Sequence, residues 1–275
     1  MIKNFLIILI SILVLFSIFI AYFTYFGITT SKFNSIIKDQ IRKQNDNIDI
    51  DLKKVKLHLD LKNISIKIKT KNPKIILKNS DELKLNEISS NVSISLYFKN
   101  KFAIENLSIK SKNNKISSYL NFYIHTNSSL KLIFLNQFIK RGMAQINVDL
   151  NFDDLGQVKS DYILSGKISD AELNFPTKTS IKNLNLNFNA EKNIYKFEKI
   201  LFRFNKINFN SDFLEVKQKN DEYIFKGNLK NKKDKINKEI INLIFNDDLK
   251  NFNFTNTKFE SISKFSFDLN KKFKI

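Results

Sequence analysis

The sequence contains no cysteine and no tryptophan, and only 5 glycines, 2 prolines and 3 arginines among its 275 residues. The lack of cysteine excludes disulfide bonds, thiol catalysis and zinc–thiolate sites. So few glycines leave little material for the tight loops that hold ligands in compact enzymes. No glycine-rich phosphate loop, nucleophile elbow or zinc motif occurs. We therefore expect neither an enzyme nor a cofactor.

The formal net charge is +19, and lysine supplies nearly all of the positive charge. An anionic partner would explain this excess, either nucleic acid or an acidic membrane surface. Nucleic-acid-binding proteins rely on arginine for bidentate contacts, whereas Arg42, Arg141 and Arg203 are scattered here. We expect no nucleic-acid partner, because a membrane surface suits diffuse lysine charge better. A strongly AT-rich genome is the alternative explanation for so much Lys, Asn, Ile and Phe.

An uncharged apolar segment runs from Phe5 to Phe26. As a helix it would be about 33 Å long, enough to cross the hydrocarbon core of a bilayer. A cleaved signal peptide is the alternative, but its apolar region would be shorter and small residues would follow it. We predict a transmembrane anchor over residues 1–28. Its representative residues are Phe5, Leu9, Leu13, Phe16, Ile20 and Tyr25.

Residues 29–45 are expected to form an amphipathic helix next to the membrane. Residues 29–31 offer an N-cap, and Ile37 and Ile41 follow at helical spacing. The positive charges of this segment, counted alone, would place the C-terminal side of the anchor in the cytoplasm. This positive-inside rule is less reliable when a large domain follows the anchor.

Beyond residue 46 the hydrophobic period changes from 3.6 to 2, which is typical of strands with one apolar and one wet face. The alternating segments include residues 55–61, 64–68, 92–98, 120–124, 146–152, 162–168, 184–188, 202–204, 207–209, 214–216, 223–225 and 265–269. We predict a mainly β fold, in which a long antiparallel strand ladder curled into a groove follows the N-terminal helix.

Two later segments show helical spacing instead. The first segment comprises residues 129–141. It ends in Lys140 and Arg141 before Gly142, and basic residues followed by glycine are a signal that ends a helix. The second segment comprises residues 236–249. No linker rich in Pro, Gly or Ser divides the chain. Residues 46–275 are therefore expected to form one β domain.

The apolar side of this ladder needs a cover, since burying one large apolar side chain contributes about 1.5–3 kcal/mol. A closed sandwich would bury that side against itself. A groove would instead accept acyl chains and leave the lipid headgroup in water. The candidate groove residues are Ile146, Val148, Leu150, Leu184, Leu186, Phe188, Phe202 and Phe204.

Two long segments, Ile48–Asn79 and Ile139–Glu191, resemble the AsmA-like family of bacterial envelope proteins. Ile48–Asn79 is similar to the N-terminal region of that family, behind a single anchor and an amphipathic helix. Ile139–Glu191 is similar to its middle region, in which a strand ladder precedes a spaced pattern ending in proline. The residues of that pattern here are Gly166, Ile168, Ala171, Leu173 and Pro176.

The resemblance implies an inner-membrane anchor, a body in the periplasm and transport of phospholipid towards the outer membrane. This chain is shorter than most relatives, so we expect either a protein partner that continues the groove at the C-terminal edge or a truncated gene. Two alternatives stay open. One is a lipopolysaccharide-export component with an anchored β-jelly roll, and the other is a scaffold for outer-membrane protein assembly.

The remaining polar residues predict no catalytic or metal site. His58 and His125 are each alone in their neighbourhood, as surface or packing histidines are. Asp49 and Asp51 share a strand face but have no His or Cys partner at metal spacing. The adjacent pairs Asp153-Asp154 and Asp247-Asp248 are expected at a turn and a helix end.

Overall fold

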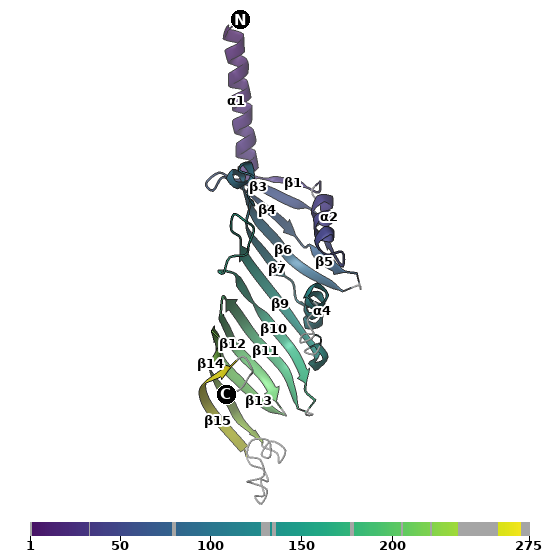
Figure 1. The fold of residues 1–275 in the computed structure, drawn as a ribbon, viewed down its shortest axis with the longest axis vertical. Coiled ribbons are helices and arrows are strands. Elements are labelled where there is room, and N and C mark those ends of the chain that lie inside the picture. Colours follow the sequence, from purple (N-terminus) through teal and green to yellow (C-terminus); the bar gives the residue numbers. More distant parts are fainter. Residues whose placement is uncertain are drawn as a thin grey trace, which may run out of the picture. The chain divides into compact units, whose positions relative to one another are not determined.

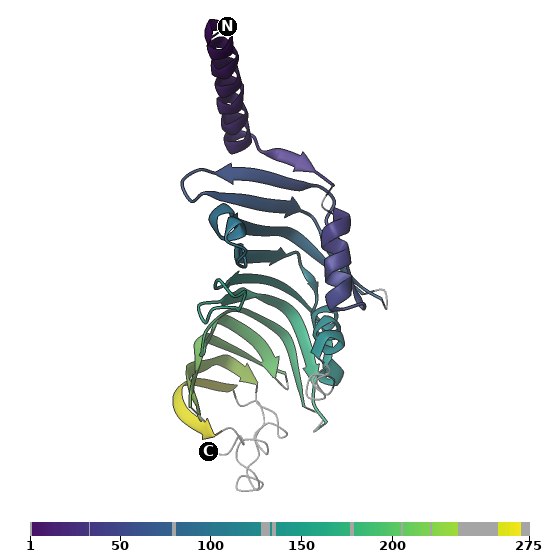
Figure 2. The ribbon, with the colours of Figure 1, turned by 45° about the horizontal axis from the view of Figure 1, so that its top comes forward.

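The computed structural model is mainly β, with one long N-terminal helix and a few short helices (Figures 1 and 2). It describes residues 2–275 except 33, 79–80, 128–132, 134–135, 177–178, 205, 221, 236–257 and 271–275. The chain forms two compact units. The first comprises Met1–Lys112 and Asn147–Tyr162, and the second comprises Asn113–Ile146 and Ile163–Ile275.

The first unit holds the helices α1 (Ile2–Tyr25), α2 (Asn34–Gln44) and α3 (Ile94–Phe98). Its strands are β1 (Ile28–Thr30), β2 (Ile48–Asp51), β3 (Val55–Asp60), β4 (Ser65–Lys71), β5 (Lys74–Leu77), β6 (Glu82–Ser93) and β7 (Ile104–Ser111). The pairing order is β1-β3-β4-β6-β7, and then the last residues of β9 (Ile139–Asn151). β5 pairs with both β2 and β6.

The second unit holds α4 (Ile116–Asn127) and the first residues of β9. Its other strands are β8 (Asn114–Lys115), β10 (Ile163–Asn174), β11 (Ser180–Glu191), β12 (Ile194–Phe204), β13 (Ile207–Lys219), β14 (Glu222–Lys235) and β15 (Lys258–Asn270). From β9 to β15 the strands are neighbours in sequence order, and β8 pairs with β9.

The antiparallel ladder is confirmed, since every strand pair resolved among the described residues is antiparallel. The expected curl into a groove is wrong, because the sheet is uncurled. Its outermost strands in the pairing order, β1 and β15, do not pair with each other in the part of the chain that the structure describes. Alternation fixes which side chains share a face, but it does not fix the curvature of the sheet.

Helix α1 confirms the apolar N-terminal segment, and its residues Lys3–Tyr25 are long and apolar enough to cross a membrane. Two serines inside it satisfy their hydroxyl groups locally: Ser11 donates to the carbonyl of Ile7 and Ser17 to that of Leu13, each at 2.9 Å. The predicted anchor residues all lie on this helix, most of whose side chains are exposed.

The chain leaves α1 through Gly27, whose φ of +70° is unfavourable for other residues. A Cβ atom there would lie 2.8 Å from Cε1 of His58, so this histidine packs against the glycine. β1 then pairs with β3, which uses the backbone of Thr29 and Thr30. For that reason the helix expected over residues 29–45 begins only at Asn34.

Two segments expected as strands are helices. In α4, Ile116, Leu120 and Ile124 are four residues apart, so the alternation of residues 120–124 fits a helix equally well. β6 ends at Ser93, whose hydroxyl accepts from the amide of Leu96 at 3.4 Å and caps α3.

The helix expected over residues 129–141 is also partly wrong. Residues 139–141 belong to β9, and Gly142 lies inside that strand instead of ending a helix. Residues 129–132 and 134–135, together with the second expected helix at 236–249, lie outside the described residues.

β-Bulges keep the apolar residues of the second unit on one face. The strand register shifts between Ile168 and Ala171, and Asp170 between them has a φ of +50°. The odd spacing of Ile168 and Ala171 would otherwise put them on opposite faces. Shifts in register also occur in β11, β12 and β13, with positive φ at Asn183 and Lys199.

Asparagine side chains complete the hydrogen bonding at these irregularities. Oδ1 of Asn185 accepts from the amide of Asp170 at 3.2 Å, and Oδ1 of Asn228 accepts from the amide of Asp212 at 2.9 Å. In the first unit Oδ1 of Asn106 accepts from the amide of Asn91 at 3.1 Å beside another register shift. The amide side chains thus satisfy backbone groups near bulges that regular pairing leaves open.

The first unit has a compact hydrophobic core under α2. Ile50, Leu52 and Val55 are buried there, and Ile37 and Ile41 of α2 pack against them. The partly buried residues that complete this cluster are Leu57, Ile68, Ile75 and Ile88. Helix α2 and β2 therefore cover part of the apolar face that β3, β4 and β6 present.

Candidate functional site

The second unit has one continuous apolar face across β10–β15. Antiparallel partners point to the same side of a sheet, so the registers define rows of side chains running across the strands. One row consists of Leu164, Ala190, Tyr195, Val216, Phe225 and Phe267. The next consists of Gly166, Phe188, Phe197, Leu214, Gly227 and Phe265. Neither row contains a charged side chain.

The opposite face of the same strands is polar. Its matching row consists of Ser165, Asn189, Lys196, Glu215, Lys226 and Ser266. Some apolar residues lie on this polar face too, such as Leu201, which pairs with Asn185 and Asn210. The two faces therefore differ in chemistry along six strands, and they offer matched positions for comparison.

Glycine and phenylalanine pair across strands at two places on the apolar face. A Cβ atom on Gly166 would lie 2.7 Å from Cζ of Phe188, and one on Gly227 would lie 2.8 Å from Cζ of Phe265. The rings therefore cover the glycines. The rings of Phe202 and Phe209 stack at 5.4 Å, and those of Phe225 and Phe267 stack at 5.1 Å.

The large side chains of this face are not enclosed. Of the described residues of the second unit, no phenylalanine or leucine is buried. The buried hydrophobic residues there are Ala144, Ala171, Ala190, Ile200, Ile207 and Val216. The result is a long apolar surface that stays partly accessible.

Helix α4 packs where the second unit has small residues. A Cβ atom on Gly142 would lie 2.7 Å from Cδ1 of Ile116 and 2.8 Å from Cα of Ala171. Tyr119 Oη donates to the carbonyl of Ala144 at 3.3 Å, which ties the helix to β9. The small side chains let the helix approach closely, whereas at Gly166 and Gly227 the rings of Phe188 and Phe265 fill the space instead.

The structure brings the predicted residues of β11 and β12 together. Leu184, Leu186 and Phe188 share the apolar face with Phe202 and Phe204 of the neighbouring strand. Those of β9 are divided between the units. Val148 and Leu150 pair with Ile109 and Leu107 of the first unit, whereas Ile146 belongs to the second.

Sequence reasoning missed much of the rest of this face. Tyr195, Phe197, Ile200 and Ile207 belong to it as well. The odd spacing of Phe197 and Ile200 hid their common face, and a bulge at Lys199 restores it. A search that allowed one skipped residue per strand would have found them.

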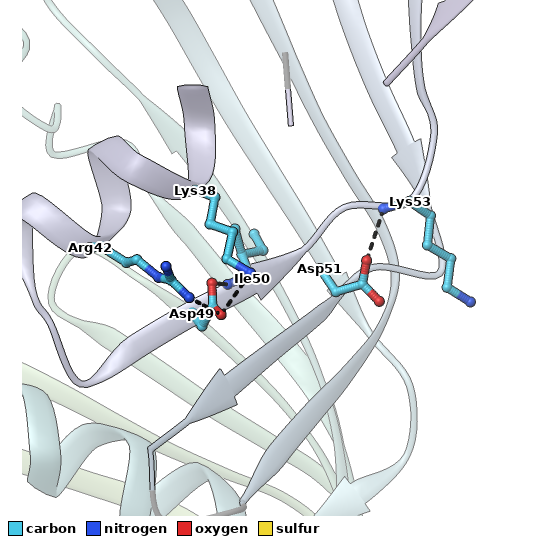
Figure 3. Close-up of polar contacts among 6 residues, drawn as sticks. All are labelled: Lys38, Arg42, Asp49, Ile50, Asp51 and Lys53. Atoms are coloured by element: carbon cyan, nitrogen blue, oxygen red, sulfur yellow. Dashed lines mark hydrogen bonds and ion pairs between the residues drawn. The ribbon is translucent and has the colours of Figure 1, made fainter. Parts of the chain in front are cut away.

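The paired aspartates of the first unit have a structural role (Figure 3). The carboxylate of Asp49 in β2 lies 2.9 Å from Lys38 Nζ and 2.8 Å from Arg42 Nη2, both on α2. Burial acts to raise the pKa of Asp49, but the hydrogen bonds from Lys38, Arg42 and the amide of Ile50 outweigh it and hold the pKa below its ordinary value. Asp51 accepts a hydrogen bond from the amide of Lys53 at 3.2 Å.

No group of three or more His, Asp or Glu residues that could hold a metal ion occurs among the described residues. No family model, no curated protein and no solved structure matches this chain.

Proposed function

We propose that this protein is a membrane-anchored lipid-binding protein that carries phospholipid acyl chains on the apolar face of its second unit. The observation that supports this is the pair of uncharged six-residue rows, whose phenylalanines remain partly accessible. Contiguous apolar surfaces of this kind on a folded domain serve as binding sites.

The dimensions of the face fit an acyl chain. Six strands spaced at about 4.8 Å span about 24 Å. The hydrocarbon of one bilayer leaflet is about 15 Å thick, half of the full core. An extended acyl chain can therefore lie across β10–β15 with its headgroup beyond the edge of the rows.

The proposed location is the bacterial inner membrane, with α1 as a single-pass anchor and the two units in the periplasm. Support comes from the length and apolar character of α1 and from the resemblance to the AsmA-like family over Ile48–Asn79 and Ile139–Glu191. The direction of transport follows from that resemblance, towards the outer membrane.

Site-specific photo-crosslinking in cells tests the proposal. A benzoyl-phenylalanine placed at Phe202 lies on the apolar face, and one placed at the adjacent Leu201 lies on the polar face. Leu201 is a demanding control, because it is apolar and 52% exposed. We expect lipid adducts at Phe202 and Phe188 and none at Leu201, identified by mass spectrometry of the released peptide.

The mass of the adduct separates the lipid classes. A phospholipid adduct supports the proposal, and a lipopolysaccharide adduct supports the export alternative. Equal labelling at Leu201 and Phe202, or no lipid at either, would refute binding on the apolar face.

A second candidate function is docking of another protein at β15. This strand has 13 residues and pairs only with β14 among the described residues. An edge of that length can accept an added strand. Protein adducts from photo-crosslinkers in β15, without lipid adducts at Phe202, would favour this scaffold function.

A further inference from the structure

The first unit exposes a cluster of large apolar side chains at one end of its strands. Leu61 and Ile64 lie in the β3–β4 turn, Tyr97 and Phe98 in α3, and Leu155 in the loop after β9. Their exposed fractions are 54%, 59%, 68%, 77% and 81%. We call these five residues the apolar tip.

The three segments of the apolar tip are joined by direct contacts. The amide of Ile94 donates to the carbonyl of Ile64 at 3.1 Å, which links α3 to the β3–β4 turn. Lys101 pairs with Asp154 at 2.7 Å, and the amide of Phe102 donates to the carbonyl of Asp154 at 3.2 Å. The tip is therefore one structured surface.

The strand registers place the apolar tip at the end of the strands where α1 joins the first unit. Ser65 pairs with Ser93 just before α3, and Asn106 pairs with Asn151 just before the loop that holds Leu155. β1 pairs Ile28 with Leu57, and Gly27 packs against His58. From Leu57 the strand runs only four residues to Leu61, about 13 Å at the usual rise. A bilayer that holds α1 would thus begin close to the β3–β4 turn and to α3, which the hydrogen bond from Ile94 joins to that turn.

We propose that the apolar tip is a second membrane contact, inserted into the interfacial region of the bilayer that holds α1. Tyrosine and phenylalanine suit this region, where their rings meet both hydrocarbon and headgroups. The inference rests on the proposed anchoring by α1, but it does not depend on lipid binding by the second unit.

The contact is apolar in character. The segments 60–64, 94–103 and 152–162 carry Lys62, Lys99, Lys101 and Lys159 against Asp60, Asp153, Asp154 and Asp161. Their formal charges cancel, although the whole chain carries +19. Insertion is therefore expected without anionic lipid and at high salt, unlike the binding of a basic patch.

The absence of tryptophan from the chain allows a direct test. The full-length variants Phe98→Trp, Phe16→Trp and Lys84→Trp each carry one fluorophore and are reconstituted into phosphatidylcholine vesicles. Bromine atoms on the lipid acyl chains, either near the headgroup or deep in the bilayer, quench nearby tryptophan. Phe16 reports from the middle of α1, and Lys84 reports from the start of β6.

We expect Phe98→Trp to lose most of its emission with shallow bromines and Phe16→Trp with deep ones, whereas Lys84→Trp loses little with either. The variant Leu155→Trp should follow Phe98→Trp, and quenching should not change when anionic lipid is added.

Three outcomes overturn the inference. If Phe16→Trp is quenched and Phe98→Trp behaves like Lys84→Trp, the first unit stands clear of the bilayer. A blue shift of Phe98→Trp that grows with protein concentration, without quenching, assigns the tip to contact between two copies of the chain. If Phe16→Trp itself is not quenched, the anchoring fails and the membrane contact fails with it.

Discussion

The two units use similar alternating strands for different purposes. In the first unit, α2 and β2 lie over the sheet and bury Leu52 and Val55 in an aliphatic core. In the second unit, phenylalanines of β11–β15 form a broader apolar face whose large side chains stay partly exposed. Alternating strands therefore do not by themselves decide between a packed core and a binding surface. The presence of a covering element over the apolar side decides it.

A matched pair of leucine substitutions tests this comparison most directly. Leu52→Ala should lower the free energy of unfolding by about 2–5 kcal/mol, because Leu52 is 5% exposed and its removal leaves a cavity. Leu186→Ala should cost about 1 kcal/mol, since its side chain is already partly in contact with water. Urea unfolding of the full chain in detergent, followed by circular dichroism, measures both. Equal losses would mean that the second apolar face is a packed core, and the comparison would fail.

The next effect concerns how the second unit stays ordered with no covering element over its apolar face among the described residues. Gly227→Ala should cost about 1–3 kcal/mol, because the new methyl group would lie 2.8 Å from Cζ of Phe265 and 3.0 Å from the carbonyl of Phe213. Adding Phe265→Ala should relieve part of this cost, which a double-mutant cycle of unfolding free energies detects.

Gly166 provides the control for that cycle. A methyl group there would meet the carbonyl of Gln145 as well as the ring of Phe188. Because a backbone carbonyl in a paired strand cannot be moved aside, Phe188→Ala should not rescue Gly166→Ala. If the Phe→Ala substitution restores stability at both glycines, or at neither, the rings do not cover the two glycines as proposed.

The smallest effect concerns the contact that holds α2 over the first unit. Asp49→Asn removes a carboxylate whose pKa is lowered in the folded state, so wild type should be more stable by up to about 1 kcal/mol at neutral pH. A lowered folded-state pKa contributes stability above the unfolded pKa, and this contribution is lost as the pH falls through the folded pKa. The difference between wild type and variant should therefore shrink below about pH 4 and disappear at lower pH.

Asp51→Asn is the matched control for this measurement, since Asp51 shares the strand with Asp49 and bonds only a backbone amide among its described contacts. Asp51→Asn should cost less free energy of unfolding at neutral pH, because it breaks no described ion pair. A pH-independent loss for Asp49→Asn would assign its role to packing instead of to the ion pairs.

The sequence allowed prediction of the strand ladder and of the apolar N-terminal helix, because both depend on local periodicity. Leu184, Leu186 and Phe188 were placed on one face by alternation alone. Helix α4 was not predicted, because the spacing of Ile116, Leu120 and Ile124 fits both the strand period of 2 and the helix period of 3.6. Helix α3 was not predicted, because Ser93 can be recognised as an N-cap only once the helical turn after it is known. That the strand ladder is uncurled depends on contacts between distant strands, which no local pattern encodes.

The β-bulges also bear on how such a chain can change in evolution. Losing one residue from a regular strand turns every following side chain to the opposite face. Losing Asp170 would only straighten β10, because Ile168 and Ala171 already share a face on either side of it. A bulged strand thus tolerates a single-residue deletion at one point without exchanging its solvent-exposed and apolar faces. Strand lengths and sequence spacing can therefore drift in this protein while the apolar face is kept.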